Sequence, residues 1–114
     1  MSVVSFALPQ SAQPQSSEAL AAALLAELPQ HAMRLPLEQA CSQGGWPGDI
    51  VRIELLDVRF TADTITFAVR LFVQEIIGGV ACAAHQSIGI LPMRAEIDRL
   101  TSQATFRIWE SDSN

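Results

Sequence analysis

Residues Val51–Ile77 read VRIELLDVRFTADTITFAVRLFVQEII, and this stretch decides the fold class. Apolar and polar side chains alternate on both sides of Thr61–Thr64, whose sequence TADT is typical of a turn. Alternation with a period of two is typical of strands that have one buried face and one exposed face. The stretch therefore predicts two long antiparallel strands joined in a hairpin.

The first of these strands contains a slip in its alternation. Leu55 and Leu56 are both apolar, and Val58 and Phe60 continue the second of the two registers. Either a β-bulge near Leu55 or a strand that is covered on both faces explains this pattern.

Two carboxylates, Asp57 and Glu75, fall on the apolar face if the alternation is followed. One interpretation is a buried carboxylate with a raised pKa, which acid–base chemistry in a cavity requires. The simpler interpretation, which we favour, is that both side chains lie near strand ends and reach solvent, or that a bulge turns Asp57 outward.

A third strand is predicted in residues 80–91, which follow the pair Gly78–Gly79. A two-residue Gly-Gly loop suits a type I′ turn, in which both central residues need positive φ. This loop length predicts that Phe72 lies opposite His85. Because the period is two, a slip of one residue would exchange the two faces of the strand.

The same geometry predicts which other side chains meet across the sheet. Closing the first hairpin at Thr61–Asp63 pairs Phe60 with Thr64 and therefore Glu54 with Arg70, and the second hairpin places Ser87 on the far side of Arg70. The apolar face, which we expect to pack on a helix, then carries Val51, Ile53, Leu55, Phe67, Val69, Leu71, Val73, Ala84 and Ile88. The mixed face is our candidate ligand or partner surface, and it carries Arg52, Glu54, Arg70, Phe72, Gln74, His85 and Ser87.

Helices are predicted before these strands. Residues 16–28 contain EALAAALLAEL after two serines that can cap a helix, and Pro29 is expected to end it. A second, short helix is predicted from Pro36 to Gly44–Gly45, and WPGD, residues 46–49, is expected to turn the chain. Residues 1–15 are expected to form a flexible arm, although their apolar side chains could instead dock as an edge strand.

The last part of the chain allows two interpretations. Pro92 is expected to end the third strand, and residues 93–103 are predicted as a helix, with another strand as the alternative. Residues 104–110 are predicted as the last strand and residues 111–114 as a frayed tail. The predicted fold is therefore one α+β domain, residues 16–110, with N-terminal helices on a three- to four-stranded antiparallel meander and an extra helix before the last strand.

Composition restricts the partners of this domain. The chain is 49% hydrophobic and only 17% charged, where about 25% is usual, so a homo-oligomer that covers apolar surface is expected. All seven basic residues are arginines, and with twelve acidic residues the net charge is −5, which argues against nucleic acid. No apolar run approaches the ~20 residues that span a bilayer, and we expect a cytoplasmic protein with Cys41 and Cys82 as reduced thiols.

No catalytic, metal-binding or nucleotide-binding motif is present, so no catalytic residue and no cofactor is predicted. The favoured function is a non-enzymatic binding or assembly protein, a small oligomeric adaptor-like or chaperone-like domain that holds another protein. The alternative is a cavity protein that binds a small hydrophobic ligand, or a lyase or isomerase, in which His85, Glu75 or Asp57 moves a proton.

Overall fold

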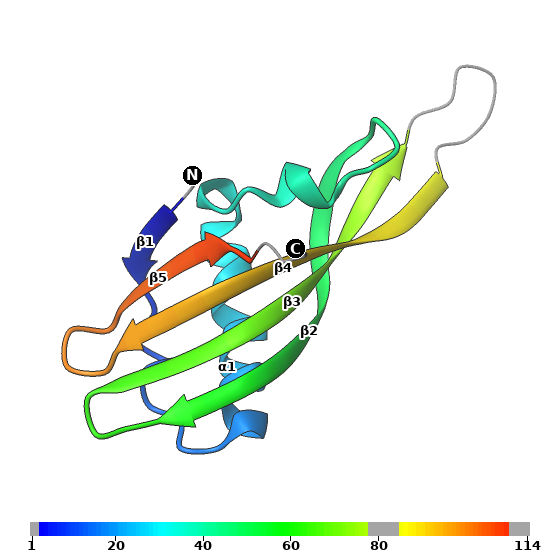
Figure 1. Ribbon diagram of the computed structural model, residues 1–114. Helices are drawn as coiled ribbons and strands as arrows, with labels where there is room; N and C mark the ends of the chain where they lie inside the picture. The colour runs from blue at the N-terminus through cyan, green and yellow to red at the C-terminus, as the bar shows by residue number, and fades with distance from the viewer. Residues whose placement is uncertain (1–2, 78–84, 110–114) are drawn as a thin grey trace, which may run out of the picture.

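The computed structural model describes residues 3–77 and 85–109, with only the backbone of residues 85 and 86. Five strands form one antiparallel sheet in the order β1-β5-β4-β3-β2 (Figure 1). The elements in chain order are β1 Val3–Ala7, α1 Ser17–Glu27, the 3-10 helices η1 Leu28–Arg34 and η2 Leu37–Ala40, β2 Trp46–Phe60, β3 Thr64–Ile77, β4 His85–Asp98 and β5 Gln103–Ile108. The α+β class is confirmed, whereas the described part has one α-helix and five strands instead of two or three helices and up to four strands.

The helix α1 begins and packs as its sequence predicts. The Ser16 hydroxyl accepts a hydrogen bond from the Ala19 amide, which satisfies one free donor of the first turn. Leu20 and Leu24 are buried against the sheet. α1 ends at Glu27, just before Pro29, as predicted, and the chain continues as the 3-10 helix η1, in which the proline occupies one of the first positions.

The second predicted helix is much shorter than expected. Only η2, Leu37–Ala40, is helical, and the chain enters β2 at Trp46. Residues 46–49 therefore begin a strand, with Trp46 paired to Ile76, and do not form the predicted turn.

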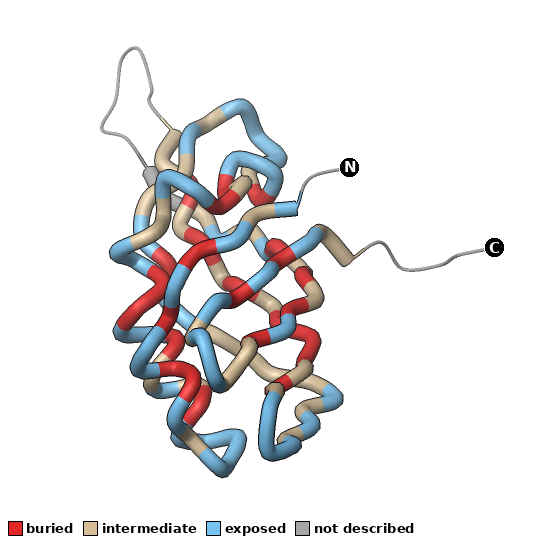
Figure 2. Tube along the Cα trace, turned by 90° about the vertical axis from the view of Figure 1, so that its left-hand side faces the viewer, coloured by how far each residue is buried: buried red, intermediate tan, exposed pale blue. Residues whose placement is uncertain are grey.

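The sheet has one covered face and one uncovered face. Figure 1 shows α1 behind the sheet and no helix on the face toward the viewer. On the covered face, which we call the inner face, every second residue of β3 from Ile65 to Val73 is buried. Figure 2 shows buried and exposed positions alternating along the strands. We call the opposite side the outer face; none of the described helices covers it.

The first hairpin has the predicted register over its central part. Glu54 lies opposite Arg70 and Arg52 lies opposite Phe72. The register shifts between Leu56 and Arg59, around Asp57, whose φ of 53° lies in the left-handed region. This bulge lies slightly further along the strand than the predicted position near Leu55.

The second hairpin contradicts the predicted register. Ile77 pairs with His85, so residues 78–84 lie between the paired strands and a two-residue loop is excluded. Gly78, Gly79 and Ala84 themselves lie outside the described residues. His85 is predicted opposite Phe72 but lies opposite Ile77, five residues further along β3. Because five is an odd number, the two faces of β4 are exchanged relative to the prediction.

Individual residues of β4 move accordingly. Phe72 lies opposite Ile90, not His85, and Arg70 lies opposite Pro92, not Ser87. Ile88, predicted on the apolar inner face, lies on the outer face because it pairs with Gln74.

The predicted helix at residues 93–103 is wrong. β4 continues through Pro92 to Asp98, and Met93, Ala95 and Ile97 are buried with a period of two. The Pro92 carbonyl oxygen accepts a hydrogen bond from the Trp109 amide, just beyond the end of β5. In an antiparallel strand the N–H and C=O of one residue point to the same side, so the N–H that proline lacks would also have pointed beyond the end of β5. The proline therefore removes no hydrogen bond between β4 and the residues of β5.

The N-terminal segment adopts the second of the two predicted arrangements. Val3–Ala7 forms β1, an edge strand that pairs with β5, and Phe6 and Leu8 are buried. Phe6 stacks on Phe106 with a ring-centroid distance of 5.5 Å, which ties this edge to the core.

Candidate functional site

The part of the outer face where β3 ends and β4 begins, which is the upper half in Figure 1, carries a cluster of large apolar side chains. We call it the apolar patch, and it consists of Trp46, Phe72, Ile76, Ile88 and Ile90. The exposed fractions of Trp46, Ile88 and Ile90 are 57%, 53% and 48%. Trp46 pairs with Ile76 and Phe72 pairs with Ile90, so these side chains are cross-strand neighbours and form one surface.

Four charged or polar residues of the predicted site lie beside this patch. The Arg70 guanidinium donates to the Glu54 carboxylate at 2.9 Å, and the Arg52 guanidinium lies 3.4 Å from the other oxygen of the same carboxylate. The Arg52 Cζ also lies 5.1 Å from the centre of the Phe72 ring. Gln74 lies on the same face and accepts a hydrogen bond from the Asp49 amide at 3.5 Å.

The remaining two residues of the predicted site are not brought to this surface by the pairing. Ser87 lies opposite Glu75, whose side chain is buried on the inner face, so Ser87 belongs to the inner side of β4. His85 lies opposite Ile77 at the end of the described strand, and its side chain is outside the description.

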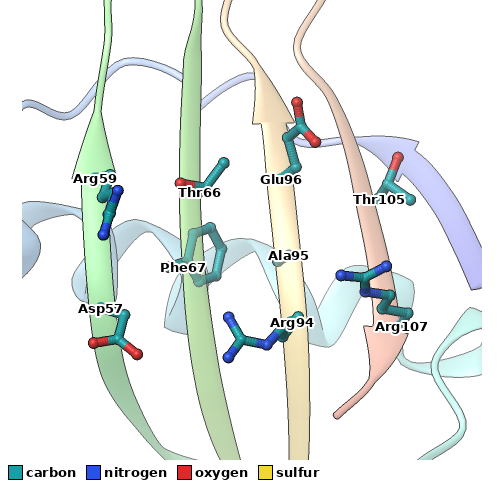
Figure 3. A pocket seen from close by; sticks show the side chains of 9 residues that line it. All are labelled: Asp57, Arg59, Thr66, Phe67, Arg94, Ala95, Glu96, Thr105 and Arg107. Carbon is teal, nitrogen blue, oxygen red and sulfur yellow. The ribbon is translucent and has the colours of Figure 1, made fainter.

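The lower half of the outer face contains a depression of about 580 Å³, which we call the arginine pocket (Figure 3). Its polar lining comes from β2, β3, β4 and β5 and consists of Asp57, Arg59, Thr66, Arg94, Glu96, Thr105 and Arg107. Figure 3 shows Asp57 and Arg59 on one side and Arg94 and Arg107 on the other. Of these residues, the sequence analysis named only Asp57, as one of the proton-transfer candidates of the cavity alternative.

Among the described residues, no carboxylate forms an ion pair with the three arginines of this pocket. Arg94 and Arg107 are direct cross-strand neighbours, and Arg59 lies on the far side of the pocket. Within residues 3–77 and 85–109, the only ion pairs are those of Glu54 with Arg52 and Arg70. With Asp57 and Glu96 also in its lining, the pocket carries three positive and two negative side chains, a net charge of +1, on a chain whose net charge is negative.

Arg94 is held by an aromatic ring. Its Cζ lies 4.9 Å from the centre of the Trp109 ring, a distance typical of a cation–π contact. Trp109 is itself fixed by the hydrogen bond from its amide to the Pro92 carbonyl oxygen at 3.1 Å. This contact restricts the guanidinium and lowers the entropy that Arg94 would lose on binding a ligand.

Glu75 is buried, but it is not the acid–base group that one interpretation of the sequence suggested. Its carboxylate accepts hydrogen bonds from the amides of Ser42 at 3.0 Å, Gln43 at 3.0 Å and Gly45 at 2.8 Å. Burial raises the pKa of Glu75, but these three hydrogen bonds outweigh it and hold the pKa below its usual value of 4.5. Glu75 therefore remains ionised and fastens the loop before β2 to the sheet.

A second buried carboxylate was missed by the sequence analysis. Glu27, at the end of α1, accepts hydrogen bonds from the Ser11 amide and hydroxyl, both at 2.7 Å, and from the Gln10 amide at 2.9 Å. These bonds fasten the segment between β1 and α1. An isolated glutamate at a helix end gives no such signal in a sequence, because its partners lie sixteen and seventeen residues away.

Of the other chemically reactive side chains that the structure describes, Cys41 and His31 do not form a catalytic arrangement. Burial, Glu75 and Glu38 together raise the pKa of the Cys41 thiol, which makes it a poor nucleophile. His31 stacks on Phe6 with a centroid distance of 4.5 Å. In the described part of the chain, no three His, Cys, Asp or Glu side chains lie close enough to hold a metal ion.

Comparison of the chain with protein-family models, curated proteins and solved structures finds no significant match. Among the described residues, no helix is long and apolar enough to cross a membrane.

Proposed function

We propose that the chain is a non-enzymatic assembly domain that associates with a second copy of itself through the apolar patch. The observation that carries the proposal is the gathering of Trp46, Ile88 and Ile90, each about half exposed, on a sheet face that no described helix covers. Large apolar side chains that remain exposed together on one surface typically mark an interface.

A second copy fits this surface because the patch carries no unpaired charge. Its neighbouring cation, Arg52, already lies beside the Glu54 carboxylate. The contact therefore needs no opposite charge from a different partner. The patch of one copy would face the same patch of the other, which is the self-complementary arrangement of a symmetric dimer.

The expected strength of this association is modest. Complete burial of such a side chain contributes about 1.5–3 kcal/mol, so a half-exposed one has about 1 kcal/mol left to gain. Trp46, Ile88 and Ile90 in two copies then contribute roughly 6 kcal/mol, similar in size to the cost of association, about 4–15 kcal/mol. Smaller contributions come from Phe72 and Ile76. The dimer is therefore expected to dissociate on dilution.

Two further expectations belong to this proposal. Cytoplasmic location is supported by Cys41, which is a free thiol. A further protein partner, held as an adaptor or chaperone holds one, stays a prediction that the apolar composition motivates.

The test introduces one charge into the patch. Ile90→Glu should convert the dimer to a monomer in size-exclusion chromatography with light scattering, because an unpaired carboxylate would be buried in the contact. Leu25→Glu is the matched control, since Leu25 is 42% exposed on α1, away from the outer face. If Ile90→Glu remains a dimer with a native circular dichroism spectrum, or if both variants dissociate, the proposed interface is wrong.

A further inference from the structure

We propose that the arginine pocket binds a small phosphorylated ligand that also carries hydroxyl groups, with a sugar phosphate as the simplest member of the class. The pocket lies in the lower half of the outer face, outside the apolar patch, so this inference does not depend on the proposed dimer.

The first argument is the charge of two adjacent arginines. Arg94 and Arg107 lie directly opposite each other on β4 and β5, and like charges in such positions destabilise a sheet. The chain has twelve acidic residues, yet within its described part none forms an ion pair with Arg59, Arg94 or Arg107. An anion bound between Arg94 and Arg107 would replace their repulsion by attraction.

The second argument concerns the geometry of the donors. The planar guanidinium group presents parallel N–H donors that match two oxygens of a phosphate group. Figure 3 shows the guanidinium groups of Arg94 and Arg107 both extending in the direction of β2. Stacking on Trp109 restricts Arg94 in advance of binding. These two arginines would therefore hold the phosphate group over β4.

The third argument separates this ligand from a bare anion. Asp57 and Glu96 also line the pocket, and their carboxylates would repel a multivalent anion that offers no hydrogen-bond donor. A ligand with hydroxyl groups can donate to these carboxylates and can exchange hydrogen bonds with the hydroxyls of Thr66 and Thr105. Asp57 lies across the pocket from Arg94 and Arg107, so the hydroxyl end would lie over β2 and β3.

The size of the pocket agrees with a small molecule. Its volume of about 580 Å³ falls within the range of about 300–1,000 Å³ that is usual for small-molecule sites. A nucleic-acid strand would need positive charge along a much longer path, and the net charge of −5 opposes it.

The experiment is isothermal titration calorimetry of the full chain with ribose 5-phosphate, with ribose and inorganic phosphate as comparison ligands. Ribose 5-phosphate should bind with a dissociation constant of about 1 mM or below, more tightly than phosphate, and ribose should not bind measurably. Arg107→Gln should weaken binding about tenfold or more, because charge-assisted hydrogen bonds are lost. Arg34→Gln, an equal change of charge at an exposed position on η1, should leave binding unchanged.

A second variant tests the hydroxyl end. Asp57→Asn should reduce the preference for ribose 5-phosphate over inorganic phosphate, and asparagine tolerates the left-handed backbone at this position. The proposal is overturned if ribose 5-phosphate does not bind, if ribose binds equally well, or if Arg107→Gln and Arg34→Gln behave alike. It is also overturned if Arg107→Gln dissociates an oligomer without any ligand effect, since the pocket would then be a protein contact.

Discussion

The packing of η2 on the sheet depends on Gly89, and this dependence can be tested with a single methyl group. Gly89 lies on the inner side of β4, opposite Val73, and the backbone of Ala40 in η2 rests directly on it. A Cβ atom on Gly89 would overlap the Ala40 carbonyl oxygen and lie 2.8 Å from its carbonyl carbon. Because these are backbone atoms, the whole of η2 must move outward to accept the substitution.

The magnitude follows from two opposing effects. Overpacking of a filled interior costs about 1–3 kcal/mol, and a clash with backbone belongs at the upper end of this range. Restricting the unfolded chain returns about 0.4–1 kcal/mol when glycine becomes alanine. We therefore expect Gly89→Ala to lower the free energy of unfolding by about 2 kcal/mol. For a domain of this size, that corresponds to a fall in Tm of roughly 8 °C.

The matched control is Gly48→Ala in β2. There the new Cβ would lie 2.7 Å from the Gln74 Oε1 atom and 3.1 Å from the Ile76 Cδ1 atom, which are the ends of side chains that can rotate away. We expect a change of at most about 0.5 kcal/mol, as for most surface substitutions. Both changes in the free energy of unfolding are to be measured by urea denaturation followed by circular dichroism. The reasoning would be refuted if Gly89→Ala is as stable as the unchanged protein, or if both variants lose the same stability.

Three further predictions concern polar and strained positions. The pKa of Glu75 is lower in the folded state than in the unfolded state, so its contribution to the free energy of unfolding is present above about pH 4.5 and is lost as the pH falls through the folded-state pKa. Glu75→Gln should therefore flatten the acid side of a curve of stability against pH, and an unchanged acid side would contradict this. Glu27→Ala leaves the buried Ser11 amide without an acceptor and should cost about 3 kcal/mol in urea denaturation, whereas a cost below about 1 kcal/mol would show that water replaces the carboxylate. Ser102 has a φ of 65°, so Ser102→Gly should raise the free energy of unfolding by about 0.5 kcal/mol, and a lower stability would argue against relief of strain at this turn.

The first hairpin could be predicted from sequence because its information is local. The predicted closure pairs Phe60 with Thr64, whereas Phe60 lies opposite Ile65; the bulge between Leu56 and Arg59 then shifts the register by one residue, so Glu54 nevertheless lies opposite Arg70 as predicted. The bulge at Asp57 was found only approximately, since two adjacent leucines show that the alternation slips but not at which residue the backbone changes.

The second hairpin could not be predicted in the same way. The pair Gly78–Gly79 offered a short loop, but Ile77 pairs with His85, and nothing in the sequence marks where pairing resumes. Because the difference is odd, this one error moved Ile88 to the opposite face and removed it from the apolar patch.

The arginine pocket was hidden by an ambiguity of spacing. Met93 and Ile97 are four residues apart, which suits one face of a helix and also one face of a strand. As a helix, this segment could not place Arg94 beside Arg107. Only the observed strand brings the two guanidinium groups together.

Sedimentation of the unchanged chain across a dilution series tests the central claim, self-association through the outer face, most directly. The account predicts a species of twice the chain mass of 12.3 kDa at high concentration that dissociates to 12.3 kDa on dilution. A mass of 12.3 kDa at every concentration would contradict it, because the half-exposed side chains of Trp46, Ile88 and Ile90 would then face solvent with no second copy to cover them.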